Sequence, residues 1–205
     1  MNDFWFDEKA ADRAVEFFPR FLRHVKGEWA GKKVELAEWQ RDRIIRPLFG
    51  WKRPDGTRKY RTVYVEVGRK NGKSTLASGV GAYLLFCDGE PGAEVYSAAA
   101  DRDQASIVFD AASQMVEASP ELAKRCDIFR KRIVVPATHS FWQVLSADVP
   151  TKHGRNPHAI LFDELHTQPN RNLWDVLKTG QGARSQPVLF RSSRRGSHPQ
   201  HFYAR

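Results

Sequence analysis

The chain has 205 residues, of which 41% are hydrophobic and 28% charged, and its formal net charge is +9. This length suffices for one well-buried α/β domain with a small helical appendage, but it is too short for two full enzymatic domains. No apolar run approaches the length that spans a bilayer, and the acidic start MNDFWFDEKA lacks the pattern of a secretory signal, so we expect a cytosolic protein.

The first 50 residues are predicted to be helical and aromatic. Four apolar residues recur at helical spacing: Phe17, Phe18, Phe21 and Leu22. A second amphipathic segment is indicated by Leu36, Trp39 and Ile44. Because proline cannot donate a backbone hydrogen bond, we expect that segment to end before Pro47. Residues 1–50 are therefore predicted to form an N-terminal helical segment.

After a turn at Pro54-Asp55-Gly56, the chain alternates between strands and helices. The strand Thr62–Val67 is followed by a loop and an Ala/Leu-rich helix that ends near Phe86. The further strands are expected at residues 93–98, 133–135, 141–145, 159–162 and 188–190, with a turn near Thr138 between 133–135 and 141–145. The further helices are expected at 101–116, where Asp101 and Gln104 resemble a capping box, in a short segment from Ser119-Pro120, and at 170–179.

This alternation predicts an α/β fold with a mostly parallel central sheet covered on both sides, in which residues 51–190 form the core. Residues 191–205 are predicted to be a basic, irregular tail. Four arginines lie in this stretch without an acid: Arg191, Arg194, Arg195 and Arg205. Without them the net charge falls from +9 to +5. The remaining charge is compatible with a DNA-facing surface or with a solvated basic surface.

The two cysteines, Cys87 and Cys126, lack the spacing of metal ligands. This observation fits a reducing compartment and argues against a disulfide scaffold and a cysteine-built zinc site.

The segment VGRKNGKST lies between a predicted strand and a predicted helix. In a phosphate-binding loop, backbone N–H groups and a helix N-terminus surround the phosphates, a lysine contacts the outer phosphates and a hydroxyl binds Mg²⁺. Gly72, Lys73 and Ser74 fit these roles, and Thr75 follows them. The usual spacing would place a glycine at Val67, whereas Gly68 comes one residue later. A basic surface turn is the alternative interpretation.

The apolar strand AILF is followed by Asp163 and Glu164. Phosphoryl transfer to water needs one acid near the Mg²⁺ ion and one carboxylate that orients or deprotonates the attacking water. Asp163 suits the first role and Glu164 the second, provided that both lie at the carboxyl end of a strand beside the phosphate loop. A helix-capping turn is the alternative interpretation of an acid pair at this position.

Gln40 precedes the first core strand within LAEWQ. A glutamine amide both donates and accepts, and can therefore pair with the donor and acceptor on an adenine edge.

Together these motifs resemble the ATPase domain of the large terminase subunit of tailed bacteriophages, a P-loop NTPase with a three-layer α/β fold. The resemblance rests on the upstream Trp-Gln pair, the loop RKNGKS, the segment from Leu145 to Gly154 and the segment ILFDELHTQPNRNLWDVL. It covers roughly residues 35 to 190.

The resemblance implies a motor domain that binds and hydrolyses MgATP to move double-stranded DNA. Its expected partners are the DNA, a small terminase subunit, a portal protein and further copies in a ring, in the cytoplasm of the host cell. By the same resemblance, Gln40 would contact adenine. The loop residues from Asn71 to Thr75 would bind phosphates, with Ser74 and Asp163 at the Mg²⁺ ion. Glu164 would be the catalytic carboxylate.

Several basic residues are further candidates for functional roles. Arg69 is at the position where these motors carry an arginine within the loop, able to reach the γ-phosphate. Arg102, Lys152 and Arg155 are candidates for a cation supplied to the next subunit of a ring, and the sequence does not choose among them. His166 could sense the nucleotide state or cap the following helix.

After Phe190 we expect the resemblance to stop, since the chain continues as RSSRRGSHPQHFYAR without the Thr/Ala/Gly-rich coupling segment, lid or nuclease domain of the family. Our hypothesis is a truncated and weakly active motor domain, with a native DNA-binding arm as the alternative. Two other functions are considered: a catalytically inactive DNA-binding or assembly module that keeps the nucleotide fold, and a fragment of a helicase-type ATPase.

Overall fold

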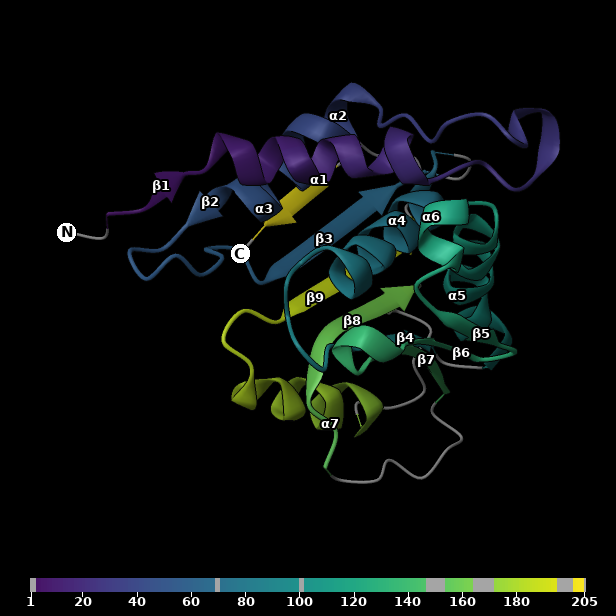
Figure 1. Ribbon diagram of the computed structural model, residues 1–205. Coiled ribbons are helices and arrows are strands. Elements are labelled where there is room, and N and C mark those ends of the chain that lie inside the picture. Colours follow the sequence, from purple (N-terminus) through teal and green to yellow (C-terminus); the bar gives the residue numbers. More distant parts are fainter. Residues whose placement is uncertain are drawn as a thin grey trace.

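An eight-stranded sheet forms the centre of the structure (Figure 1). The computed structural model describes residues 3–68, 71–99, 102–146, 154–163, 172–194 and 201–204. The strands in chain order are β3 (Thr62–Val67), β4 (Glu94–Ala99), β5 (Asp127–Phe129), β6 (Arg132–Val135), β7 (Ser140–Ser146), β8 (Pro157–Asp163), β9 (Val188–Arg194) and β10 (His201–Ala204). Their order across the sheet is β10-β3-β9-β8-β4-β7-β6-β5.

The five adjacent strands from β3 to β7 in that order are parallel to one another, whereas β10, β6 and β5 pair antiparallel to their neighbours. Parallel pairing requires a crossover, usually helical, between consecutive strands. The chain provides α4 (Lys73–Phe86) between β3 and β4, and α5 (Arg102–Glu117) between β4 and the strands β5 to β7. The predicted mostly parallel sheet is confirmed.

Helices cover both faces of the sheet. The helices α1 (Glu8–Phe21), α4 (Lys73–Phe86) and α5 (Arg102–Glu117) pack into the larger of two hydrophobic clusters, and α7 (Asn172–Gly180) packs into the smaller one. Alternate residues of β8 point into different clusters: Ala159 and Leu161 into the larger, Ile160 and Phe162 into the smaller. This alternation makes β8 apolar throughout, as predicted for a strand buried on both faces.

The helix α4 is buried on nearly all sides, because every residue from Leu76 to Leu85 is buried. It lies between the sheet and the helices α1 and α5. Two of its glycines allow this close packing. A Cβ at Gly79 would overlap the ring of Phe18 of α1, and a Cβ at Gly81 would overlap Trp142 and Leu161 of the sheet.

The N-terminal helical segment shares the larger cluster with the sheet, through residues such as Phe18, Ile44 and Leu48. Its second helical part consists of α2 (Glu38–Gln40), a π-helical turn (Arg41–Ile45) and α3 (Arg46–Gly50). The prediction that this segment ends before Pro47 was wrong. The backbone N–H of Arg46 bonds to the carbonyl of Arg41, five residues back, and this wider turn accommodates the proline that follows without breaking the helix.

Short antiparallel elements were harder to predict. The pair β1 (Trp5–Phe6) and β2 (Trp51–Lys52) forms a separate two-stranded sheet, and β5 adds an edge strand to β6. Neither β1, β2 nor β5 has the four to eight residues over which an alternating pattern can be recognised. The predicted strands before and after Thr138 are confirmed as β6 and β7, with a 3₁₀ turn at Pro136–Thr138 between them.

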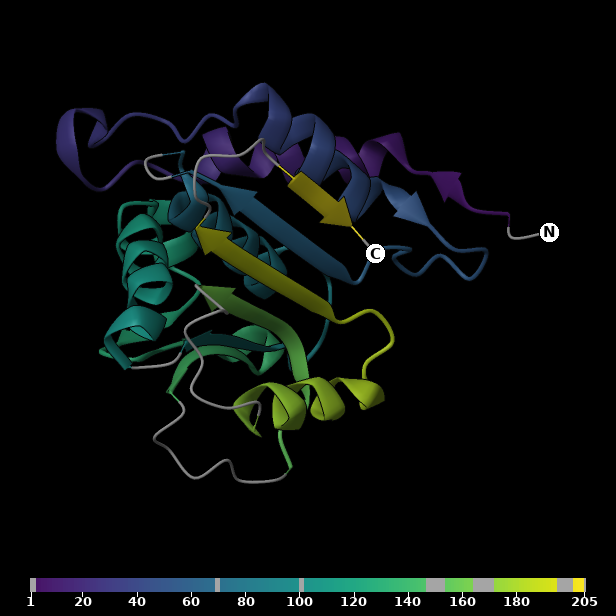
Figure 2. The same ribbon diagram turned by 180° about the vertical axis from the view of Figure 1, so that it is seen from behind.

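The prediction of an irregular chain after Phe190 was wrong where the structure describes it. β9 continues to Arg194, and β10 pairs antiparallel with β3 (Figure 2). The polar run RSSR lies at the carboxyl edge of the sheet, where Ser192 and Ser193 are buried and the Ser192 hydroxyl donates to the carbonyl of Phe162.

In the described part of the chain, no helix combines the length and the apolar character that crossing a membrane requires. Cys87 and Cys126 are both free thiols, and burial raises the pKa of each, to about 11 for Cys126.

Candidate active site

The loop between β3 and α4 is built around Gly72. This residue has φ +70°, in the left-handed region that favours glycine, and it is the N-cap of α4. Its carbonyl accepts the first helical hydrogen bond from the Leu76 N–H, at 2.9 Å. The next residues, from Lys73 to Thr75, form the half-buried first turn of a 14-residue helix, whose N-terminal amides and dipole favour an anion.

Gln40 lies against this loop. Its Oε1 accepts from the Ala37 N–H at 3.0 Å, and its Nε2 donates a long hydrogen bond of 3.5 Å to the carbonyl of Asn71. The side chain is buried, with 8% exposed, and a Cβ on Gly72 would lie 3.2 Å from its Nε2. This contact brings together two residues that are 31 positions apart in sequence. The adenine contact that the resemblance implies for Gln40 stays a prediction.

The ends of β3 and β8 lie at the same edge of the sheet. Asp163 is the last residue of β8 and pairs with Ser192 of β9, and Ser192 in turn pairs with Val65 of β3. One strand therefore separates β8 from β3, so their ends are about 10 Å apart. The predicted role of Asp163 depends on a position beside the phosphate loop. Asp163 shares the sheet edge with that loop, and β9 lies between β8 and β3.

Two residues of this edge were not predicted from the sequence. Ser192 and Ser193 of β9 are buried, and the Ser192 hydroxyl donates to the carbonyl of Phe162 at 3.5 Å. They lie on the strand between the β3–α4 loop and Asp163. The sequence signal for these serines is a pair of small polar residues shortly after the apolar run of a strand. Residues 191–205 were instead predicted to be an irregular tail.

Several predicted site residues lie outside the described residues: Arg69, Glu164, Lys152 and His166. For Asp163 and Arg102 the structure describes the backbone alone, at the end of β8 and the start of α5. The predicted roles of all site residues therefore stay predictions.

The donors that could hold a metal at this edge are the Ser74 hydroxyl and the Asp163 carboxylate. Oxygen ligands of this kind suit Mg²⁺, which binds through one or two carboxylates together with substrate phosphates. No group of three or more His, Cys, Asp or Glu side chains that could hold a metal ion occurs among the described residues. A hard cation bound jointly by a hydroxyl, an acid and a phosphate is consistent with this donor set.

Arg155, a candidate for a cation supplied to a neighbouring subunit, lies just before β8, at the opposite edge of the sheet from the β3–α4 loop. Its guanidinium lies over the Tyr96 ring, 5.2 Å from the centroid. Burial and a hydrogen bond to Glu94 raise the pKa of Tyr96 to about 12, so the ring hydroxyl stays neutral. Arg155 is thus half-buried against its own subunit.

Comparisons with known proteins identify the family and the fold of the chain. The family model described as "Terminase large subunit, ATPase domain" matches residues 38–197. This range extends beyond Phe190, so the expected end of the resemblance at that residue was wrong. The large terminase subunit of Enterobacteria phage HK97 is 31% identical over 184 residues, which is 87% of this chain and 35% of the relative. The chain thus spans about a third of the length of that relative.

Solved structures give the same result. The crystal structure of the HK97 large terminase superposes with a TM-score of 0.74 at 27% identity, covering 94% of this chain and 38% of that one. The large terminase ATPase domain of Thermus phage P74-26, in a mutant form, shares the fold, with a TM-score of 0.55 at 24% identity over 68% of this chain and 62% of that one. The fold is therefore the P-loop fold of the terminase ATPase domains. From the matched family model and the phage HK97 relative, we conclude that the chain belongs to the family of terminase large subunit ATPase domains.

Proposed function

We propose that this chain binds MgATP at the carboxyl edge of its sheet and hydrolyses it as the motor domain of a phage DNA-packaging machine. One observation carries the proposal: the β3–α4 loop, with Gln40 against it, shares a sheet edge with the end of β8 at Asp163. Ligands of open α/β sheets bind outside the carboxyl ends of the strands.

Binding would use three groups of atoms. The Gln40 amide would pair with the adenine edge. The backbone N–H groups from Asn71 to Thr75 and the ammonium of Lys73 would surround the phosphates. Ser74 and Asp163 would hold Mg²⁺, which when bound neutralises charge on the β- and γ-phosphates. Gly72 supports this arrangement, because a side chain there would approach Gln40 and fill space at the loop.

Hydrolysis would depend mainly on positioning and on charge stabilisation. The carboxylate of Glu164 would orient the attacking water and accept its proton. Lys73 and Arg69 would offset the negative charge that develops on the transferred phosphoryl group. Both cations belong to the segment between one strand and one helix, so this single loop would bring both positive charges to the transferred phosphoryl group.

The DNA, the small terminase subunit, the portal protein and a homo-oligomeric ring are proposed partners, since the HK97 relative is a large terminase subunit. We place their action in the host cytoplasm. The positive net charge of +9 is compatible with binding to DNA.

The first test measures MgATP affinity by isothermal titration calorimetry for the intact chain and for Lys73→Ala. We expect an affinity about tenfold to hundredfold lower in the variant, because one charge-assisted contact to phosphate contributes about 1.5–3 kcal/mol. Lys9→Ala, an exposed lysine of α1, is the matched control and should bind like the unmodified chain. No binding by the intact chain would favour an inactive scaffold.

A second arm of the same test separates binding from hydrolysis. Glu164→Gln keeps the shape of the side chain but removes its basicity. We expect MgATP affinity within about threefold of the intact chain and a turnover at least about a hundredfold lower, as for loss of a general base. Equal turnover in both proteins would exclude Glu164 as the catalytic carboxylate.

A further inference from the structure

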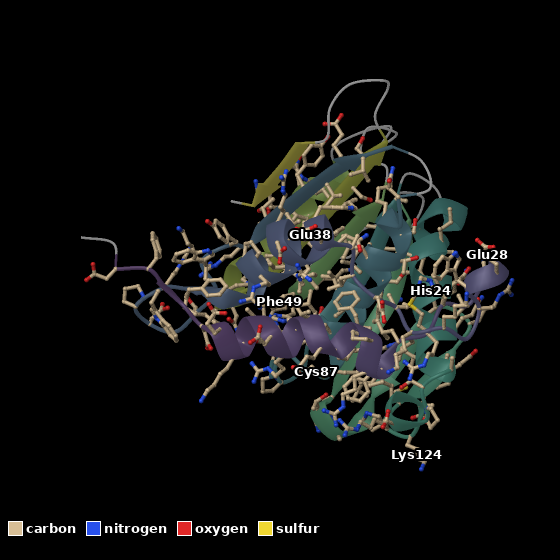
Figure 3. All side chains as sticks on the ribbon, turned by 90° about the horizontal axis from the view of Figure 1, so that it is seen from above. His24, Glu28, Glu38, Phe49, Cys87 and Lys124 are labelled. Atoms are coloured by element: carbon tan, nitrogen blue, oxygen red, sulfur yellow. The ribbon has the colours of Figure 1, made fainter. Side chains whose placement is uncertain are left out.

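A basic hairpin, residues 22–34, projects from the molecule between α1 and α2 (Figures 1 and 3). Its base is anchored in the core by Leu22 and Val34, which are 0% and 3% exposed. The two arms are joined by an antiparallel bridge between Arg23 and Lys33 and by hydrogen bonds from His24 N to Lys32 O (2.9 Å) and from Gly31 N to His24 O (2.8 Å). The hairpin is therefore an ordered element that is held together by its own hydrogen bonds and has a defined tip.

The tip carries cations that form no ion pair with the described residues. All residues from 26 to 33 are exposed, including Lys26, Lys32 and Lys33. None of these lysines takes part in an ion pair within the part of the chain that the structure describes. Glu28 is the one acid between Leu22 and Val34. The fourth cation, Arg23, instead holds the hairpin to α1, since its Nη1 donates to the carbonyl of Pro19 at 3.0 Å.

An exposed tryptophan lies among these lysines. The Trp29 side chain is 55% exposed, and the ammonium of Lys32 lies 4.5 Å from its ring centroid. The indole contacts Lys32 and lies 6.1 Å, between ring centroids, from His24 of the same hairpin, yet more than half of it stays exposed to water. An aromatic ring beside ammonium groups suits a ligand with anionic and apolar parts in alternation. The sugar-phosphate backbone of a nucleic acid has this chemistry.

The hairpin lies past the carboxyl edge of the sheet, on the side to which the arrowheads of β3 and β9 point (Figures 1 and 2). Glu28 marks its far end in Figure 3. The return arm leads from Val34 through Ala37 to Gln40, whose amide contacts the nucleotide loop at Asn71. The tip and the loop are thus joined by a short, hydrogen-bonded stretch of chain.

We infer that this basic hairpin is a contact site for the phosphate backbone of duplex DNA, placed at the same edge of the molecule as the nucleotide site. The inference rests on the proposed function for the identity of the polyanion as duplex DNA. Lys26, Lys32 and Lys33 contact phosphates, and Trp29 covers the adjoining sugar. Lysines bind phosphate as point charges, so the contact reads no base sequence.

The test compares the full chain with the triple variant Lys26→Gln/Lys32→Gln/Lys33→Gln. The probe is a fluorescein-labelled duplex of about 30 base pairs, and fluorescence anisotropy is recorded from about 50 to 200 mM salt. Removing three phosphate contacts should weaken binding about tenfold or more and reduce the slope of log K against log salt by about 3. Trp29→Ala should weaken binding without changing this slope, because the indole carries no charge.

The matched control removes the same charge elsewhere. Lys9→Gln/Lys124→Gln/Arg130→Gln changes three exposed cations on α1, after α6 (Pro120–Ala123) and between β5 and β6. If this control loses as much affinity as the hairpin variant, the effect is one of net charge and the inference is overturned. It is also overturned if the hairpin variant binds duplex normally, or if it loses only the binding of a single strand of the same length.

Nucleotide binding keeps the two proposals separable. The hairpin variant should bind MgATP within about twofold of the intact chain, because none of its changed lysines forms an ion pair with a described residue of the β3–α4 loop. An intact chain that binds duplex through the hairpin but binds no MgATP would contradict the proposed function alone. An intact chain that binds MgATP but shows equal duplex affinity in the hairpin variant would contradict the hairpin inference alone.

Discussion

Asp88 joins three parts of the chain at the amino edge of the sheet, opposite the candidate active site. Its carboxylate accepts from both terminal nitrogens of Arg58, at 2.9 and 2.7 Å, and contacts Nε2 of His158 of β8 at 2.7 Å. Arg58 also donates to the carbonyl of Gln186, just before β9. Arg58 and His158 are 1% and 0% exposed, so this network aligns the starts of β3, β8 and β9 in a buried setting.

The protonation of Asp88 leads to a prediction about acid stability. Burial by itself would raise the pKa of this carboxyl, but Arg58 and His158 outweigh burial and lower the pKa to about 2. The carboxylate therefore stays ionised to a lower pH in the folded chain than in the unfolded chain. Its contribution to stability is complete above about pH 4 and is lost as the pH falls towards 2. Urea denaturation across this range should show the decline.

Asp88→Asn should abolish this part of the pH dependence. At neutral pH it should lower the free energy of unfolding by about 3–5 kcal/mol, because Arg58 would remain buried without its counter-ion. Asp127→Asn, a change of an exposed acid on the edge strand β5, is the control and should alter stability by less than about 0.5 kcal/mol. An unchanged acid profile in Asp88→Asn would show that the network does not stabilise the fold in this way.

At the scale of elements, the position of α4 determines that of the nucleotide loop. The helix begins at Lys73, directly after Gly72, and its body is held by the sheet and by two helices. Trp142 of β7 packs against α4, and its Nε1 donates to the hydroxyl of Ser97 at 2.8 Å. The Ser78 hydroxyl of α4 donates to the carbonyl of Val108 in α5, also at 2.8 Å. These contacts leave α4 little freedom to shift.

The glycines of α4 give a prediction for this packing. In an isolated helix Gly→Ala stabilises by about 1 kcal/mol. At Gly81 the added methyl would overlap Trp142 and Leu161, so Gly81→Ala should instead destabilise by about 1–3 kcal/mol. Gly182→Ala is the control, since a Cβ there meets nothing within 4 Å. Thermal unfolding measures both, and a melting temperature raised by Gly81→Ala would contradict the packing described here.

At the scale of the whole molecule, the N-terminal helices and the sheet share the larger hydrophobic cluster, and β10 forms one edge of the sheet. The larger cluster contains buried residues from many parts of the chain, from Ala14 of α1 to Phe190 of β9. β10 pairs with β3 over four residue pairs, from His201 with Glu66 to Ala204 with Val63. It therefore covers the outer edge of the strand that leads into the nucleotide loop.

Replacing residues 201–204 by Gly-Ser-Gly-Ser should uncover that edge. We expect a lower melting temperature and more self-association in light scattering, because an unpaired strand edge can pair with another chain. Replacing the same residues by Thr-Val-Thr-Val keeps a strand-forming sequence and should leave both measurements closer to those of the original chain. Identical behaviour of the two variants would mean that backbone pairing of β10 is not what protects β3.

The sequence predicted those features that depend on local patterns. The alternation in Thr62–Val67 and the apolar helix after Gly72 identified β3, the loop and α4 with matching bounds, since periodicity and turn chemistry operate over neighbouring residues. The motifs also identified the family. Local rules failed at two places. The helix continues through Pro47 because a π-helical turn precedes it. The strand β9 continues to Arg194 although its last residues are polar.

The tertiary structure decided the order of the strands and the contacts between residues that are far apart in the chain. The sequence made the role of Asp163 depend on a position beside the phosphate loop. The strand order places β9, with Ser192 and Ser193, between β8 and the strand that leads into that loop. It did not predict the buried network around Asp88 or the pairing of β10 with β3, because such contacts join residues far apart in the chain. Sequence periodicity specifies which face of an element is apolar, but the order of strands depends on how all those faces are buried together.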